Sequence, residues 1–515
     1  MSSRALFWNS VSGTALYAMT VVVSFSMSPF LVHRLGDGGY GFWELVLGLV
    51  GYLGILDLGV GPAVVRYVAL AASSGDRTRL ARVVNAGFAT FLVAGSVGAL
   101  VIAVVALKPD VVFGDVPVTL RDARLAIGCA ALLFLFTFTR ATFSASLMGL
   151  QYHRIVNTTR IVTALGQAVA IYLLLRDNQP HALVRVAAVA TAVTFLETLF
   201  FAAVLRTKLP GGYRPFSASW QEGRDLFGFG AKSAGLMASS SLVRQGILFV
   251  LAHGPGAAAV TIYVLAGRLV DYGQQLAFAI GFPMAPYLTA AFGSGGLEGA
   301  KLAWLSTTRV MQFIQSGIAM GLICLGLPFL ARWMGPEYAV RGAGAFYFLC
   351  GAALFTVVGA NANRMLVSLN QHGRAAIAAL VIGVVSLAAA YVLSLYYGLV
   401  GAAAGACAFA CALNLTELVL ACRALGLPLG PQLVRPLLRN LPAVVAGGVV
   451  MQLAVRYVPT VSYANIAVVG VLGAVVYLVV SALTALDGAE RARLAMAVKT
   501  KFGGAKAARA AAPNP

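Results

Sequence analysis

The sequence has little charge and no long polar segment. Only 10% of its 515 residues are Asp, Glu, Lys or Arg, whereas soluble domains carry roughly 25%. Hydrophobic residues make up 60% of the chain, and the mean hydropathy is +0.86. This composition excludes an ordinary soluble domain and indicates a protein whose solvent is the lipid bilayer.

Patterns for metal binding, disulfides and nucleotide binding are also missing. The six cysteines lie within apolar runs, without a CxxC pair or a histidine at ligand spacing, so we expect core-packing thiols and no metal site. The segment GFGAKS at 228–233 is the nearest approach to a phosphate-binding loop, but it lacks the required glycines. We therefore expect no cofactor, no catalytic residue and no ATP-driven step.

The net charge of +20 is spread along the whole chain, which argues against nucleic acid as a partner. In the short connections between apolar runs, Lys and Arg are roughly two- to threefold more frequent on one side than on the other. By the positive-inside rule, this bias predicts that both termini are cytoplasmic. We expect a multi-pass protein of the cell (inner) membrane with membrane lipids around it.

Apolar runs long enough to cross the bilayer occur about fourteen times, so the predicted fold is an all-α membrane protein. The predicted spans are 10–31, 41–70, 83–107, 121–148, 156–175, 182–205, 226–251, 257–290, 304–328, 342–368, 375–396, 399–422, 437–456 and 464–485.

An internal repeat relates the first twelve spans. An offset of 220 residues pairs Gly36 with Gly256 and Glu197 with Glu417, and the chain contains only seven glutamates. Six spans per repeat predict two parallel halves around a central cavity, which is a transporter architecture. The predicted parts are listed in chain order: an N-terminal lobe at 1–210, a C-terminal lobe at 211–430, two further helices at 431–486 and a basic cytoplasmic tail at 487–515.

Several charged residues fall inside predicted spans, where charge is costly unless it faces a cavity or a partner. Guanidinium groups suit phosphate oxygens, so we expect five arginines to line a substrate site: Arg140, Arg364, Arg244, Arg268 and Arg66. Four carboxylates are candidates for ion coupling: Asp57, Asp271, Glu197 and Glu417.

Structural roles remain open for these residues. Arg268 and Asp271 are three residues apart on one helix and could form a clamp. Arg66 could reach the cytoplasmic interface. Glu197 and Glu417 could pair with neighbouring arginines instead of relaying protons.

The segment from Arg34 to Ala69 resembles a known family signature. The matching positions are Gly36, Tyr40, Gly41, Trp43, Asp57, Gly59, Arg66 and Ala69, and the turns LQYHR and NQHGR are similar too. The resemblance is to the polysaccharide transporters, the O-antigen and exopolysaccharide flippases of the multidrug, oligosaccharidyl-lipid and polysaccharide exporter superfamily. It implies two six-helix lobes around a cavity and a polyprenyl-pyrophosphate-linked oligosaccharide as substrate.

The predicted function is therefore a flippase in O-antigen, exopolysaccharide or capsule biosynthesis. It would work by alternating access, with other polysaccharide-assembly proteins as further partners, and it would not be an enzyme. An ion-coupled antiporter of drugs or organic cations is the alternative, and it would need an acidic cavity. A membrane-embedded glycan polymerase or ligase fits less well, because the longest outward loop, 108–120, is short.

Overall fold

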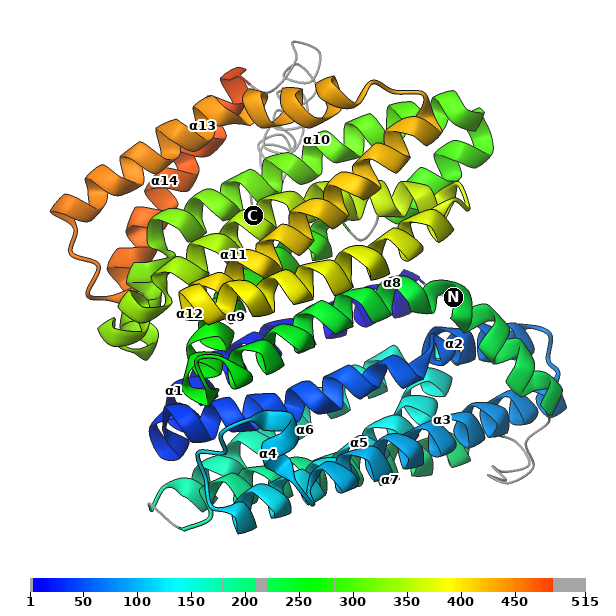
Figure 1. Ribbon diagram of the computed structural model, residues 1–515. Helices are drawn as coiled ribbons and strands as arrows, with labels where there is room; N and C mark the ends of the chain where they lie inside the picture. The colour runs from blue at the N-terminus through cyan, green and yellow to red at the C-terminus, as the bar shows by residue number, and fades with distance from the viewer. Residues whose placement is uncertain (1–2, 178–179, 210–219, 282–283, 485–515) are drawn as a thin grey trace, which may run out of the picture. The chain divides into compact units, whose positions relative to one another are not determined.

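A computed structural model describes residues 3–177, 180–209, 220–281 and 284–484. Within these ranges every regular element is a helix, and most helices are long (Figure 1). The predicted all-α membrane fold is thus confirmed. The predicted tail at 487–515 lies outside the described residues, as does the 210/211 boundary between the predicted lobes.

The helices follow one another with short connections. In chain order they are α1 (Ser3–Leu53), the 3₁₀ turn η1 (Gly54–Asp57), α2 (Val60–Ser73), α3 (Arg77–Val105), α4 (Pro109–Phe113), α5 (Leu120–Gly149), α6 (His153–Leu175), α7 (Ala182–Lys208), α8 (Trp220–His253), α9 (Ala257–Gly281), α10 (Met284–Met334), α11 (Pro336–Ser368), α12 (His372–Leu425), α13 (Leu429–Tyr457) and α14 (Tyr463–Thr484).

Three of these helices contain a sharp break at a glycine with positive φ: α1 at Gly36, α10 at Gly296 and α12 at Gly398. Gly36 and its repeat partner Gly256 have φ values of 69° and 94°. Glycine adopts this backbone without the clash that a Cβ would cause. Both paired positions therefore have a backbone that favours glycine.

The predicted span 41–70 is wrong as one continuous helix. It is interrupted by η1, after which Leu58 and Gly59 adopt left-handed conformations with φ of 46° and 77°. Asp57 then accepts a hydrogen bond from the backbone N–H of Gly61 at 2.9 Å. A carboxylate that takes a free N–H in the first turn of α2 stabilises a new helix start, which the apolar pattern alone did not reveal.

The described chain divides into two compact units. Unit 1 contains the chain up to Arg268 together with Val340–Ala352 and Asn370–Thr416. In it α5 packs against α2, α3 and α7, while α1 packs against α6 and α8. A Cβ on Gly98 would lie only 2.1 Å from the Phe134 ring, so the absence of a side chain permits the close contact between α3 and α5.

Unit 2 contains Leu269–Ala339, Ala353–Leu369 and the described chain from Glu417 onward. Here α10, α13 and α14 pack on one another around Met320, Met451 and Tyr477. The Tyr477 hydroxyl donates to the Phe313 carbonyl oxygen at 2.6 Å, which satisfies a polar group at lipid depth. The division of the chain at 1–210, 211–430 and 431–486 stays a prediction.

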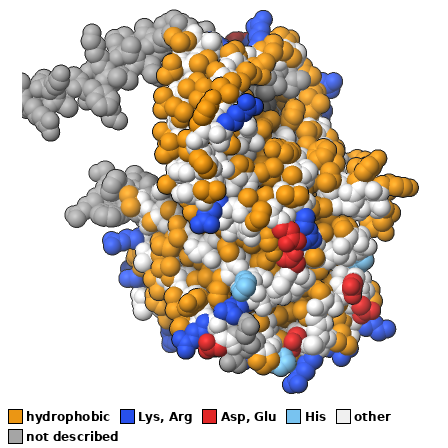
Figure 2. Space-filling model, turned by 90° about the vertical axis from the view of Figure 1, so that its left-hand side faces the viewer, with side chains coloured by type: hydrophobic (Ala, Val, Ile, Leu, Met, Phe, Trp, Pro, Cys, Tyr) orange, Lys and Arg blue, Asp and Glu red, His pale blue; other side chains and the backbone are white. Residues whose placement is uncertain are grey.

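Ten helical ranges among the described residues are long and apolar enough to cross a membrane. Three of them, Val11–Asp57, Ala257–Met334 and Gly373–Leu425, contain the glycine breaks, so the predicted number of fourteen spans stays a prediction. Hydrophobic side chains are spread over the whole face shown in Figure 2, and most of the charged side chains lie in the lower half of the view. This surface is that of an integral, multi-pass membrane protein.

Candidate functional site

In unit 1, Glu197 on α7 lies in an ion-paired cluster. Its Oε2 atom is 2.5 Å from Nη1 of Arg140 on α5, and its Oε1 atom is 3.9 Å from Nε of Arg160 on α6. The Glu197 side chain is only 4% exposed. The first contact is a charge-assisted hydrogen bond, whereas the second is too long for one. The structure thus joins two predicted site residues, Arg140 and Glu197, and adds Arg160, which the sequence analysis missed.

In unit 2, Glu417 on α12, which the predicted repeat pairs with Glu197, is equally buried at 4% exposure, but its hydrogen-bond partner differs. The amide Nδ2 of Asn363 on α11 donates to its Oε1 atom at 2.7 Å. Asn361 lies two residues earlier on α11. Its Nδ2 atom donates to Oγ1 of Thr308 at 2.6 Å and to Oγ1 of Thr307 at 3.2 Å. Polar residues of α11 therefore tie this helix both to α10 and to the end of α12.

Arg364 is the residue after Asn363 on α11, and its guanidinium lies in a different environment from the Asn363 amide. Its Cζ atom lies 5.8 Å from the centroid of the Phe278 ring, and its Nη1 atom is buried without a hydrogen-bond partner among the described residues. A Cβ on Gly281 would come within 3.3 Å of that Nη1 atom, so the glycine leaves room for the guanidinium. Arg364 is a cation that the described part of the chain does not pair with a carboxylate.

Arg268 on α9 belongs to a further buried cluster in unit 1. Its Nη2 atom forms a short ion pair with Glu44 of α1, its Nη1 atom donates to Oγ of Ser28 at 2.6 Å, and its Cζ atom lies 5.8 Å from the Tyr40 ring centroid. The structure therefore gives Arg268 a carboxylate from another helix. The sequence offered a signal, since Glu44 is one of the seven glutamates and falls in a predicted span.

The remaining predicted site residues lie elsewhere. Arg66 on α2 and Arg244 on α8 are exposed, and the Cζ atom of Arg66 lies 5.8 Å from the Tyr67 ring centroid. Asp57 stabilises the start of α2, and Asp271 is half-buried on α9. Within the residues described, no cluster of His, Cys, Asp and Glu is suited to hold a metal ion.

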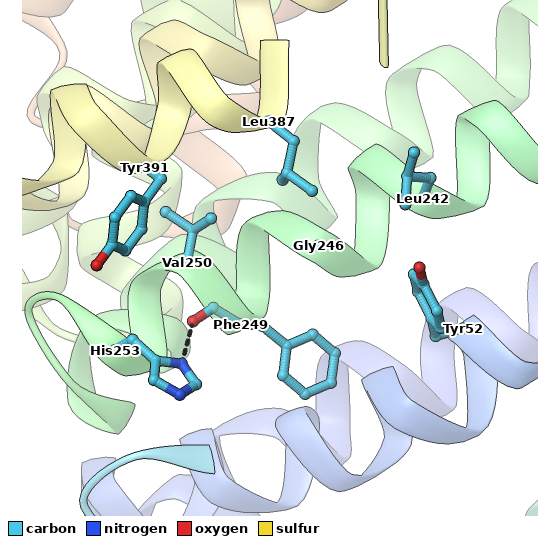
Figure 3. A pocket seen from close by; sticks show the side chains of 8 residues that line it. All are labelled: Tyr52, Leu242, Gly246, Phe249, Val250, His253, Leu387 and Tyr391. Carbon is cyan, nitrogen blue, oxygen red and sulfur yellow. Dashed lines mark hydrogen bonds between the residues drawn. The ribbon is translucent and has the colours of Figure 1, made fainter. Parts of the chain in front are cut away.

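Two cavities lie within unit 1. The first, of about 330 Å³, is apolar and is lined by Tyr52, Leu242, Gly246, Phe249, Val250, His253, Leu387 and Tyr391 (Figure 3). At one end of it, Nδ1 of His253 is hydrogen-bonded to the Phe249 carbonyl oxygen at 2.9 Å. The lining includes none of the five predicted arginines, so this cavity offers an apolar surface and no site for an anion.

The second cavity, of about 310 Å³, is polar and lies at the first turns of α3 and α8. Its lining is Tyr67, Arg79, Arg82, Val83, Gln221, Glu222, Asp225 and Leu226. Nε of Arg82 pairs with Oε1 of Glu222 at 2.8 Å, which links the two helix starts. Neither arginine was singled out from the sequence, because both lie outside the apolar runs.

Comparison with known proteins identifies the family. Residues 6–292 match the family of polysaccharide biosynthesis proteins. The chain belongs to this family. This family membership confirms the resemblance noted for the segment from Arg34 to Ala69. A relative from Bacillus subtilis (strain 168), the uncharacterized membrane protein EpsK, is 25% identical over 381 residues, which cover 73% of this chain and 75% of the relative.

Solved structures share the fold at low sequence identity. A multidrug resistance MATE family transporter of the MOP superfamily, in its inward-facing conformation, matches with a TM-score of 0.64 and 17% identity over 80% of this chain and 94% of that one. A MOP superfamily transporter from Pyrococcus furiosus, for which a reverse polarity of the binding pocket was described, matches with a TM-score of 0.59 and 16% identity over 82% and 95%. This family member therefore has the MATE-like fold.

Proposed function

We propose that this protein is a flippase that moves a lipid-linked oligosaccharide across the membrane for polysaccharide biosynthesis. The observation that carries the proposal is the match of residues 6–292 to polysaccharide biosynthesis proteins in a chain with a transporter fold. Such a pathway assembles glycans on a lipid carrier on one side of a membrane and uses them on the other. A chain of apolar helices with a transporter fold fits the crossing step.

Within this function, Arg364 is the residue that contacts the anionic headgroup. A polyprenyl pyrophosphate carries negative charge next to a long apolar tail, and a guanidinium binds phosphate oxygens through a pair of N–H groups. The buried Nη1 atom of Arg364 has no partner among the described residues, so it is able to donate to such an oxygen. Arg140 and Arg268 already donate to Glu197 and Glu44, which makes them weaker candidates for this contact.

The wider arrangement follows from the same proposal. The halves would alternate between openings to the two sides, the protein would lie in the inner membrane with both termini in the cytoplasm, and it would act as a transporter and not as an enzyme. Its partners would be the lipid-linked oligosaccharide, membrane lipids and other polysaccharide-assembly proteins.

An antiporter of drugs or organic cations is the second candidate, and the MATE-like fold favours it. Such a protein needs carboxylates that are available to a cationic drug. Glu197 and Glu44 are each engaged by an arginine, and Glu417 accepts from Asn363, so none of these three is placed for that task.

The test is flipping by the purified protein in liposomes that contain a polyprenyl-pyrophosphate-linked oligosaccharide. We expect Arg364→Ala to lower the initial rate roughly tenfold or more, because a charge-assisted contact contributes about 1.5–3 kcal/mol. Arg364→Lys should retain part of the rate. Arg423→Ala, which removes an exposed arginine from the last turn of α12, is the matched control and should leave the rate unchanged.

Two outcomes would contradict the proposal. Wild-type protein that does not flip the glycolipid but extrudes a lipophilic cation would favour the antiporter. Flipping that survives Arg364→Ala at the wild-type rate would leave the flippase in place and remove Arg364 from the headgroup contact.

A further inference from the structure

The two repeat-related glutamates differ in the chemistry of their partners. Glu197 and Glu417 occupy the same place in the repeat and are equally buried at 4% exposure. Glu197 receives Arg140 at 2.5 Å and has Arg160 at 3.9 Å, whereas Glu417 receives the neutral amide of Asn363 at 2.7 Å. A carboxyl group at lipid depth is stable either beside a cation or with a proton of its own. Glu197 has the cation beside it, whereas Glu417 has a neutral partner that is compatible with a protonated carboxyl group.

The partner also decides which forms of the carboxyl group can be bound. A guanidinium only donates hydrogen bonds, so Arg140 suits the ionised carboxylate of Glu197. A carboxamide carries both an N–H donor and a C=O acceptor, so Asn363 can donate to a carboxylate or accept from a carboxylic acid after a rotation of its amide. A protonated carboxyl group keeps one acceptor oxygen for either partner, but only the Asn363 amide also offers an acceptor for the new O–H.

The other polar groups around Glu417 leave this difference intact. On its own helix, Asn414 and Thr416 donate to the carbonyl oxygens of Ala410 and Ala412 at 2.6 and 2.8 Å. On α11, the next residue after Asn363 is Arg364, whose guanidinium lies over the Phe278 ring. Arg423, further along α12, is exposed. Among the described residues, the side chain from a neighbouring helix that is hydrogen-bonded to the Glu417 carboxyl is thus the amide of Asn363.

We propose that Glu417 is the proton-binding group that couples this transporter to a proton gradient, a role that rests on the flippase function proposed above. In one half of the cycle the Glu417 carboxylate takes a proton from water on one side of the membrane. In the other half the carboxylic acid releases that proton to water on the opposite side. Glu197, whose carboxylate is paired with Arg140, serves as a structural ion pair.

The direct test uses wild-type protein and no substrate. Dicyclohexylcarbodiimide partitions into apolar regions and reacts with protonated carboxyl groups, and mass spectrometry locates the adduct. In detergent or liposomes we expect modification of Glu417 that falls by about tenfold from acidic to alkaline buffer, as for a group that loses its proton over that range. Glu197 in the same sample is the internal control, and its labelling should be about tenfold weaker than that of Glu417 in acidic buffer.

Failure of this inference can be told apart from failure of the flippase proposal, because the labelling needs no glycolipid. Equal labelling of the two glutamates, or no labelling of Glu417 at any pH, would overturn the assignment even if flipping is observed.

The second measurement is flipping under an imposed pH gradient. Wild-type rates should depend on the gradient, whereas Glu417→Gln, which mimics the protonated form, should flip at a rate independent of it. A Glu417→Gln rate that still follows the gradient would also overturn the assignment.

Discussion

The Glu197 region of unit 1 and the Glu417 region of unit 2 are paired by the predicted internal repeat, yet they accommodate a buried carboxyl group differently. In unit 1, Arg140 on α5 forms an ion pair with Glu197. In unit 2 the corresponding helix supplies Asn363, while Arg364 beside it points to Phe278. The positive charge is thus close to the carboxylate in one half and separated from it in the other.

The two proposed roles divide along this difference. An ion pair between helices contributes a fixed contact, because breaking it leaves an uncompensated buried charge. Separating the two charges releases the arginine for an external anion and leaves the carboxyl group free to change its protonation state. On this view unit 1 holds a structural ion pair, and unit 2 holds the two chemically responsive groups, Arg364 and Glu417.

The largest expected difference is in stability. Glu197→Gln should lower the free energy of unfolding by on the order of 3 kcal/mol, because Arg140 would lose its buried counter-charge. Glu417→Gln should cost under about 1 kcal/mol, since an amide can still accept from Asn363. Denaturant unfolding of both variants in the same detergent measures the comparison.

Glu298→Gln is the control for this stability measurement. Glu298 is exposed and lies 3.4 Å from Lys301, so its loss should change the unfolding free energy by less than about 1 kcal/mol. Equal costs for Glu197→Gln and Glu417→Gln would mean that the two regions do not differ in the way their contacts suggest.

An intermediate effect is expected from converting one region into the other. Asn363→Lys places a cation beside Glu417, which should hold the carboxylate ionised and lower its carbodiimide labelling roughly tenfold, to the level of Glu197. Labelling as a function of pH measures this change. Asn363→Gln keeps a neutral amide and is the control that should retain labelling. If labelling of Glu417 persists beside the new lysine, the partner of the carboxyl group does not decide its protonation.

The sequence predicted the helical membrane fold because hydropathy carries that information, whereas the repeat that pairs Glu197 with Glu417 stays a prediction. It also placed Arg140 and Arg364 inside spans correctly. It could not assign every partner: Arg268 pairs with Glu44, which lies 224 positions away in the chain. Such contacts depend on how helices rotate about their axes, which is set by packing across many neighbours.

Helix interruptions were the other part that hydropathy could not supply. The turn at Gly54–Asp57 has the same apolar composition as the helices around it, so the predicted span 41–70 ran through it. What ends α1 there is local backbone geometry, namely the left-handed Leu58 and Gly59 and the capping contact of Asp57. The contact between Asn363 and Glu417 was not predicted either. Asn363 carries no charge, so it did not stand out as a candidate site residue within an apolar run.

The smallest effect is expected at Asp76, an exposed carboxylate that serves as the aqueous reference for the two buried glutamates. The backbone N–H of Arg79 and the Thr78 hydroxyl donate to Oδ1 at 2.8 and 2.7 Å, and these bonds hold the pKa of Asp76 below its ordinary value of 3.8. Its contribution to the start of α3 is therefore fully present above the unfolded pKa and is lost as the pH falls through the lowered native pKa.

Asp76→Ala should raise amide hydrogen exchange in the first turn of α3 at neutral pH. The difference from wild type should vanish in strong acid, and a difference that persists there would show that the charge of Asp76 is not what stabilises this helix start.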